Sequence, residues 1–172
     1  RKALEKYRGI YKKNIKDENI RILVCGGTGC VAGGANDIYE RFLQLASKYE
    51  NVSVEIGGEA HEGIHTGVHK SGCHGFCEMG PLVRIEPYGY LYIKVRVSDC
   101  DAIFNATCLG GEPLQDLMYK INGVVYEGQE EIPFYKKQTR HVLKNCGHID
   151  ALSIEEYLAV DGYKALAKAL FD

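Results

Sequence analysis

Four cysteines are arranged in two closely spaced pairs. Cys25 and Cys30 enclose four residues (GGTG), and Cys73 and Cys77 enclose three (HGF). Thiolates suit soft and borderline metals, and a cluster of two irons needs two thiolates on each iron, because two bridging sulfides already fill half of each tetrahedron. Two loops with a cysteine at either end supply this set when the fold brings them together. The spacing therefore predicts a [2Fe–2S] cluster on these four cysteines.

The two loops are also rich in glycine, which lets backbone approach a cluster closely. These glycines are Gly26, Gly27, Gly29, Gly72 and Gly75. Their backbone N–H groups are candidate donors to sulfur. Four paired cysteines also describe a structural zinc site, although its commonest knuckle has two intervening residues. The longer, glycine-rich loops favour the iron–sulfur cluster, and zinc on the same cysteines stays the alternative.

Two other redox patterns fit less well. A catalytic disulfide is typically CxxC, a spacing that the sequence lacks, so a thiol–disulfide oxidoreductase comes third. Gly27, Gly29 and Ala32 spell GxGxxA after an apolar run, the outline of a dinucleotide-binding fingerprint. However, the clearest helix cap is Asn36, further along, and no second βαβ half follows. We therefore do not expect dinucleotide binding in this loop.

The remaining cysteines and histidines are not expected to carry chemistry. Cys100, Cys108 and Cys146 are predicted to be small buried hydrophobic side chains. Glycines surround His61, His65 and His69 in the Gly/His-rich stretch of residues 57–69, which favours a loop with surface histidines. For His74, between two of the paired cysteines, we expect a side chain that faces solvent.

The composition is that of an ordinary globular chain. The formal net charge is −2 over 172 residues, which gives no basic footprint for nucleic acid. No apolar run of about 18 residues is present, so we expect no membrane span. Residues 1–16 are charged throughout and lack the apolar stretch of a signal peptide. Seven cysteines, an odd number, without an export signal indicate a reducing compartment, and we expect the cytoplasm.

The paired cysteines are expected to sit on an α/β framework. Residues 1–17 predict a helix packed through Leu4, Tyr7, Ile10 and Tyr11. Then come a buried strand (19–25), a helix capped by Asn36 (to residue 50), a strand (51–56), a hairpin (82–86 and 90–97) and a helix (98–109) capped by Ser98 and Asp101. This order makes a layered α/β sandwich of the thioredoxin-like kind.

The sequence changes character after Pro113. Asn122–Gly123 and residues 127–133 are expected to be irregular connector, and Ser153 with Glu156 predicts a helix start. A further helix from residue 163 has no stop signal before Asp172. We therefore expect the protein to continue beyond this residue.

Two stretches resemble known families. ILVCGGTGC and SGCHGFCEMGPLVRIEP resemble the thioredoxin-like [2Fe–2S] ferredoxin domain. IPFYKKQTRHVLKNCGHIDALSIEEYLAVDGYKALAKAL resembles the start of the flavin- and NADH-binding subunit family, which includes the NADH-binding subunit of respiratory complex I. Together they resemble the beta subunit of NAD-dependent, often electron-bifurcating, [FeFe]-hydrogenases. The chain departs from the family pattern at Ala151, at Asp161 and in its long Gly/His-rich loop.

The resemblance implies a division of the chain and a cofactor set. It implies an N-terminal helix (1–18), a ferredoxin domain (19–116), and a linker with the truncated, mostly helical start of an FMN/NADH-binding domain (117–172). It assigns the [2Fe–2S] ligands to Cys25, Cys30, Cys73 and Cys77, and names no catalytic residue here. FMN, NAD and a [4Fe–4S] cluster are expected only beyond residue 172. The implied function is single-electron relay within an NADH-dependent oxidoreductase, with other iron–sulfur or hydrogenase-type subunits as partners.

Overall fold

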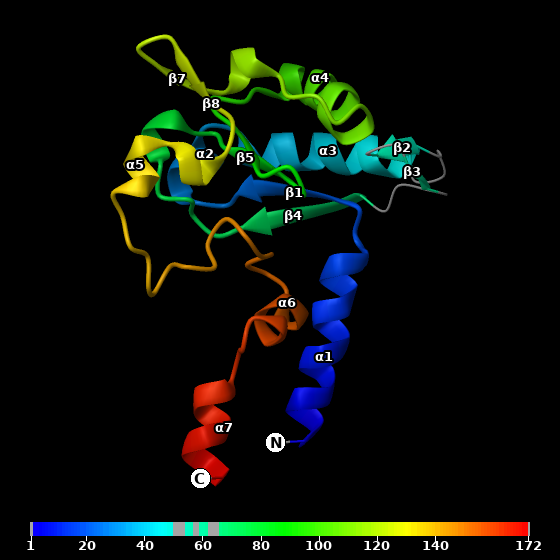
Figure 1. Ribbon diagram of the computed structural model, residues 1–172, viewed down its shortest axis with the longest axis vertical. Helices are drawn as coiled ribbons and strands as arrows, with labels where there is room; N and C mark the ends of the chain where they lie inside the picture. Colours follow the sequence, from blue (N-terminus) through cyan, green and yellow to red (C-terminus); the bar gives the residue numbers. More distant parts are fainter. Residues whose placement is uncertain (1, 50–53, 57–58, 62–65, 172) are drawn as a thin grey trace.

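A four-stranded mixed sheet forms the centre of the computed structural model, which describes residues 2–49, 54–56, 59–61 and 66–171 (Figure 1). The strands lie in the order β4 (Thr66–Ser71), β1 (Ile20–Cys25), β5 (Val83–Glu86) and β6 (Tyr90–Tyr92). β1 runs parallel to β4 and antiparallel to β5, which pairs antiparallel with β6. The predicted α/β class is confirmed, and the predicted order holds for this sheet except that β4 takes the place of the expected second strand.

The central strand β1 is buried along its whole length. Successive side chains point to opposite faces of a strand. Ile22 and Val24 belong to the main core together with Phe42 of α3 (Ala35–Tyr49). Arg21 points to the other face, where its guanidinium meets Glu156 of α6 (Ile154–Ala159). The sheet therefore lies between α3 and α6.

A second helical layer lies beside α3 (Figure 1). Here α4 (Cys100–Ile103) continues as a π-helical turn, η3 (Phe104–Leu109), and the rings of Tyr49 and Phe104 lie 5.4 Å apart. The predicted helix is thus present, but its cap differs: the backbone N–H of Arg96 donates to Asp99 at the start of η2 (Val97–Asp99). Asp101, which we expected in the cap, pairs with Arg41 of α3 instead.

The second strand of the sheet was predicted in the wrong place. The expected strand, residues 51–56, is described only at β2 (Val54–Ile56), which pairs with β3 (Glu59–His61) in a separate hairpin. The strand that runs parallel beside β1 is β4, which begins within the Gly/His-rich stretch. Its sequence, TGVHKS, lacks the apolar run of a buried parallel strand, because its side chains are mostly half-buried.

The loop after β1 begins a helix sooner than expected. α2 (Thr28–Ala32) opens directly after Gly27, and Asn36 lies inside α3, where its side chain accepts from Lys70 at 3.1 Å. The prediction that Asn36 caps this helix was therefore wrong. The first argument against a dinucleotide fingerprint, that no helix opens on the glycine loop, was wrong for the same reason. The second reason holds: within the described strands, β1 and β4 form the only parallel pair.

The chain after residue 116 returns to the sheet. Asn122 and Gly123 form the turn of a hairpin, β7 (Tyr119–Ile121) and β8 (Val124–Tyr126), rather than irregular connector. Its flanks form bridges to the outer strand β6, at Tyr92 with Met118 and at Tyr90 with Gly128. Beyond β8 come η5 (Gln129–Glu131) and α5 (Pro133–Lys136). Met118, Ile132 and Tyr135 are part of the main core, and the division of the chain at residue 116 stays a prediction.

The opposite edge of the sheet is closed by a later segment. Ser71 of β4 forms a bridge with Asp150, and the N–H of Ala151 donates to the carbonyl of Lys70 at 2.8 Å. The predicted cap of α6 is confirmed, because Ser153 accepts from the N–H of Glu156. The chain that follows the sheet therefore contacts both of its edges, beside β6 and at the last two residues of β4.

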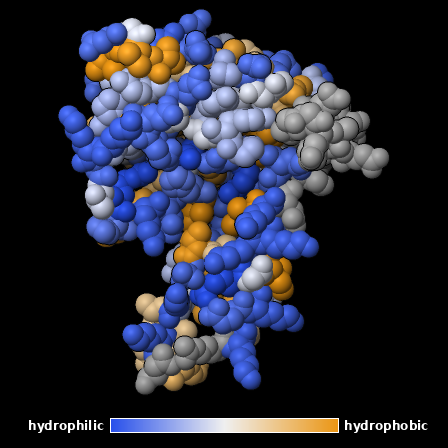
Figure 2. Space-filling model, viewed as in Figure 1, coloured by the Kyte–Doolittle hydropathy of each residue, from blue (hydrophilic) through white to orange (hydrophobic). Residues whose placement is uncertain are grey.

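Helices α1 (Lys2–Asp17), α6 and α7 (Lys164–Phe171) form an arm below the sheet (Figure 1). α1 packs against α6 as expected, but its most buried side chain is Arg8, whereas Tyr7 and Ile10 are exposed. Apolar atoms reach the surface on α7, where Leu170 and Phe171 are each 66% exposed (Figure 2). None of the described helices has the length and hydropathy needed to cross a membrane.

Candidate metal centre

The four paired cysteines lie at neighbouring ends of the elements around β1. Cys25 is the last residue of β1 and Cys30 lies in α2, and both are buried. Cys73 follows β4 and is half-buried. Cys77 begins the short helix η1 (Cys77–Met79) and is exposed. The set therefore runs from the core to the surface.

The thiol groups of these cysteines are close neighbours. The Cys25 thiol interacts with those of Cys30 and Cys73, and Cys73 interacts in turn with Cys77. Two glycines make room for the sulfurs. A Cβ at Gly27 would lie 2.9 Å from the Cys73 sulfur, and one at Gly80 would lie 2.7 Å from the Cys30 sulfur. The loops thus bring all four thiols into one site lined by bare backbone.

The electrostatics of the site favour a thiolate at Cys25. A hydrogen bond from the Cys30 thiol, together with the backbone N–H groups of His74 and Gly27, lowers the pKa of Cys25 to about 6 against the opposing effect of burial. Because the proton stays on its partner, the pKa of Cys30 is raised. Burial raises the pKa of Cys73, whose sulfur also accepts from the Gly75 N–H at 3.4 Å. Backbone donors and thiol donors fit a metal centre of thiolate ligands.

His74 was expected to face solvent, and this prediction was wrong. Its side chain is fully buried, with Nε2 2.7 Å from Ser71 Oγ and Nδ1 3.0 Å from Gln129 Oε1. Burial lowers its pKa to about 4, so the imidazole is neutral near pH 7. Ser71 Oγ also lies 3.2 Å from the carbonyl of Val24. His74 therefore ties the loop of Cys73 to the end of β1 and to η5.

The Gln129 amide completes this arrangement. As placed, its Nε2 has no hydrogen-bond partner in the described part of the chain. Exchanging the amide O and N lets Gln129 donate to Nδ1 of the neutral imidazole, while Nε2–H donates to Ser71 and Ser71 donates to Val24. Gln129 lies 55 residues from His74 in sequence. No local sequence signal connects the two residues.

Aromatic rings enclose one side of the site. Phe76, between the second pair of cysteines, is 7% exposed and stacks on Phe134 of α5 at 4.6 Å between ring centroids. Its ring edge also meets Tyr119 and Tyr135, at 5.3 Å and 5.7 Å. These contacts come from the chain after residue 116. They exclude water from the inner part of the site and leave Cys77 at its open side.

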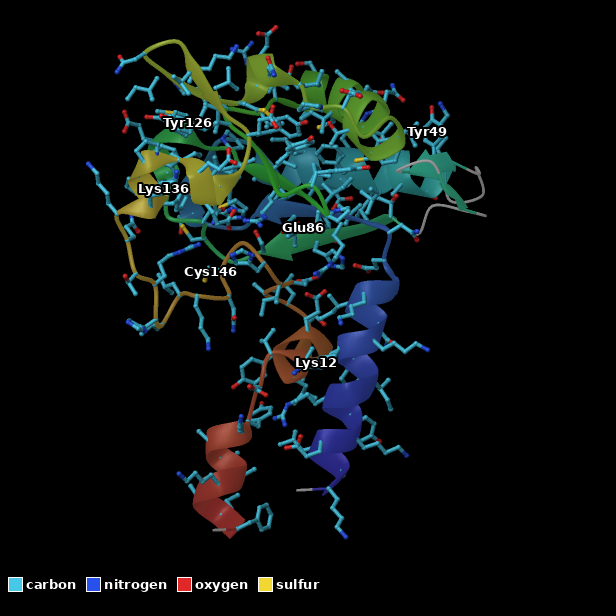
Figure 3. The ribbon with its side chains drawn as sticks, viewed as in Figure 1. Lys12, Tyr49, Glu86, Tyr126, Lys136 and Cys146 are labelled. Carbon is cyan, nitrogen blue, oxygen red and sulfur yellow. The ribbon has the colours of Figure 1, made fainter. Side chains whose placement is uncertain are left out.

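The predictions for the other cysteines and histidines are confirmed for some residues and wrong for others. Cys100 and Cys108 are fully buried, as predicted. Cys146 is half-exposed, contrary to prediction, in the loop between α5 and α6 below the sheet (Figure 3). His69 also differs, because it lies in β4 and contacts carboxylates of Glu18 and Asp150. His65 lies outside the described residues, as does the side chain of His61.

The chain is similar to known iron–sulfur proteins, although no protein-family model matches it. It is 27% identical to "Ferredoxin, 2Fe-2S" of Aquifex aeolicus (strain VF5) over 89 residues, which are 52% of this chain and 71% of that protein. A stretch of 35 residues, 20% of this chain, is 54% identical to "NADP-reducing hydrogenase subunit HndC" of Solidesulfovibrio fructosivorans. That stretch is 7% of the hydrogenase subunit, so the chain spans only a small part of that relative.

Solved structures give a similar result. The thioredoxin-like [2Fe–2S] ferredoxin from Aquifex aeolicus aligns with a TM-score of 0.46 and 25% identity, over 58% of this chain and 89% of that chain. A second structure, of the wild-type protein, aligns with a TM-score of 0.44 and 24% identity, over 60% of this chain and 99% of that chain. The α/β class itself follows from the sheet and helices of the present chain.

Proposed function

We propose that this protein carries a [2Fe–2S] electron-transfer domain, formed by residues 19–116, with Cys25, Cys30, Cys73 and Cys77 as ligands. The observation that carries the proposal is the convergence of these four thiols, from two loops far apart in sequence, on one glycine-lined site. The similarity to the Aquifex 2Fe-2S ferredoxin over about half of the chain supports it.

The two loops favour a cluster over a single zinc ion, because four and three residues separate the paired cysteines and the loops are rich in glycine. A structural zinc site needs four ligands around one centre at about 2.0–2.3 Å. A cluster of two irons spreads its four thiolates over two centres. Zinc on the same cysteines, in a structural docking module, is the competing outcome of the metal analysis below.

The protein residues have separate roles in this proposal. Such a cluster, when bound, supplies a one-electron redox couple. Cys25 and Cys30 anchor the inner side, and the backbone N–H groups of His74 and Gly27 stabilise negative charge on the Cys25 sulfur. Phe76 keeps water from this inner side. Cys77, the exposed ligand, offers the shortest route for an electron to a partner.

The wider context is an oxidoreductase complex. The short match to a NADP-reducing hydrogenase subunit and the resemblance of residues 132–170 to flavin- and NADH-binding subunits support a role in an NADH-dependent oxidoreductase of the hydrogenase or complex I type. FMN, NAD and [4Fe–4S] sites would then belong to other parts of the protein, and other iron–sulfur or hydrogenase-type subunits would be the partners. All seven cysteines are free thiols, which fits a cytoplasmic location.

The test is an electron paramagnetic resonance spectrum of the anaerobically purified, dithionite-reduced protein, with iron, acid-labile sulfide and zinc assayed on the same sample. We expect a rhombic S = 1/2 signal and equal amounts of iron and sulfide. A silent spectrum with stoichiometric zinc would overturn the proposal. Cys73→Ser should abolish or grossly perturb the signal, whereas Cys108→Ser, at a buried cysteine outside the site, should leave it unchanged.

A further inference from the structure

Tyr135 in α5 presents a buried hydroxyl without a partner. The residue is 8% exposed, and its Oη has no hydrogen-bond partner in the described part of the chain. Three contacts fix the ring. Its centroid lies 5.7 Å from that of Phe76 and 5.2 Å from that of Phe134, and the guanidinium of Arg140 lies 5.5 Å from the ring centre. A buried polar group without a hydrogen bond destabilises the folded state. A structure that keeps this hydroxyl buried therefore calls for an acceptor.

The ring of Tyr135 lies against the loop that carries Cys73 and Cys77, because Phe76 of that loop meets its edge. Burial and the negative charges of Cys25, Cys73 and Cys30 raise the pKa of Tyr135, while Arg140 opposes them. Oη makes no hydrogen bond to the sulfurs of these cysteines. A group held by the four thiols would supply the acceptor that the protein itself does not.

We propose that Tyr135 donates a hydrogen bond from Oη to a sulfur of the cluster and so raises its reduction potential. The inference rests on the proposed function. Reduction adds a negative charge, and a hydrogen-bond donor stabilises the more negative state. A phenol in a dry site acts more strongly than one in water.

Tyr135 belongs to a different part of the chain from the four cysteines. It lies in the segment after residue 116, which the resemblance assigns to the linker of a flavin-binding part. Tyr135 is held on the site by Phe76, from the loop between Cys73 and Cys77. The potential of the electron-transfer domain would then depend on a residue supplied by the segment that follows it.

The experiment compares Tyr135→Phe with Tyr92→Phe. Each change removes one buried phenolic oxygen, but Tyr92 Oη already lies 2.6 Å from Thr107 Oγ1 and accepts from the Leu114 N–H at 3.2 Å. Redox titration followed by electron paramagnetic resonance should give a more negative midpoint potential for Tyr135→Phe and the wild-type potential for Tyr92→Phe. A wild-type potential in Tyr135→Phe, at full iron and sulfide content, would overturn the inference.

Stability of the metal-free protein gives a second readout. Without the cluster the Tyr135 hydroxyl lacks its partner, so Tyr135→Phe should unfold at the same or a higher denaturant concentration than wild type. Tyr92→Phe should unfold at a lower one, because it removes a satisfied hydrogen bond. A clear loss of stability in metal-free Tyr135→Phe would show that the hydroxyl bonds to the protein itself, and the inference would fail. A wild-type protein without iron and sulfide would instead refute the proposed function.

Discussion

Nη2 of Arg21, in the central strand, donates to both carboxylate oxygens of Glu156 in α6, at 2.7 Å each. The two side chains are 8% and 9% exposed, so the ion pair is buried. Glu156 also accepts from the backbone N–H of Asp150, at 2.9 Å. One carboxylate therefore joins α6 and the segment before it to the face of the sheet opposite α3.

Removing this carboxylate should destabilise the protein. Glu156→Ala removes two charge-assisted contacts from the buried Arg21 guanidinium and leaves it with Glu18, whose carboxylate lies 2.8 Å from Arg21 Nε. We therefore expect a loss of about 2 kcal/mol in the free energy of unfolding, measured by denaturant titration. Asp116→Ala removes a fully exposed partner of Lys120 and should cause no measurable change. Equal stability of Glu156→Ala and wild type would mean that α6 does not depend on this pair.

Stability should fall as the pH rises above neutrality, through His69. Burial lowers the pKa of His69, but the hydrogen bond and the charge of Glu18, with the charge of Glu156, raise it to a net value above the ordinary 6.5. A raised pKa in the folded state stabilises the fold fully below the unfolded value, and the contribution is lost as pH rises through the folded value. The difference in unfolding free energy between wild type and His69→Gln should therefore shrink as the pH rises from the unfolded value of about 6.5 through the folded value. A difference that stays constant or grows over this range would contradict the expectation.

Two glycines should control loading of the metal centre. A Cβ at Gly27 or Gly80 would meet the Cys73 or Cys30 sulfur below 3.0 Å. We therefore expect Gly27→Ala and Gly80→Ala to lower the iron content per protein strongly. Gly29→Ala is the matched control in the same loop, because its Cβ would lie 3.7 Å from the Cys77 Cβ, an ordinary contact. Full iron content in both Gly27→Ala and Gly80→Ala would show that the site is wider than the structure indicates.

Removing the metal should uncover one cysteine. Cys77 is exposed, so in the loaded protein we expect its sulfur to be protected from iodoacetamide only by ligation. Chelation of the metal should make Cys77 reactive, as peptide mass mapping would show. Cys100 should stay unreactive in both states, because it is fully buried and burial raises its pKa to about 12. Rapid alkylation of Cys77 in the loaded protein would exclude it as a ligand.

The grouping of the four cysteines could be predicted from sequence because their signal is local, and their role as ligands stays a prediction. Short spacing and glycine content are visible in the printed chain, and the structure brings the two pairs together. The hairpin of β5 and β6 was equally accessible, since its strands are apolar and its turn contains Pro87 and Gly89. The strand β4 was missed because an edge strand needs little apolar sequence. The alternation of residues 51–56 gave a stronger strand pattern.

The surroundings of the site could not be predicted in the same way. His74 is buried because Gln129 and Ser71 offer hydrogen bonds to both ring nitrogens, and Gln129 reaches it only through the fold. The aromatic contacts of Phe76 likewise reach Phe134 and Tyr135, which lie about 60 residues further along the chain, in a segment with no cysteine pair. Both depend on long-range packing, which a single sequence does not display.

The bridges at the two outer strands bear on how the protein avoids self-association. An uncovered strand edge offers unpaired N–H and C=O groups to any other chain, and it is a common start of aggregation. Met118 and Gly128 occupy the edge at β6, and Asp150 and Ala151 occupy the edge at β4. A chain cut after residue 116 would keep all four cysteines but lose both covers. We therefore expect such a fragment to associate through its strand edges, which the segment after residue 116 contacts in the whole chain.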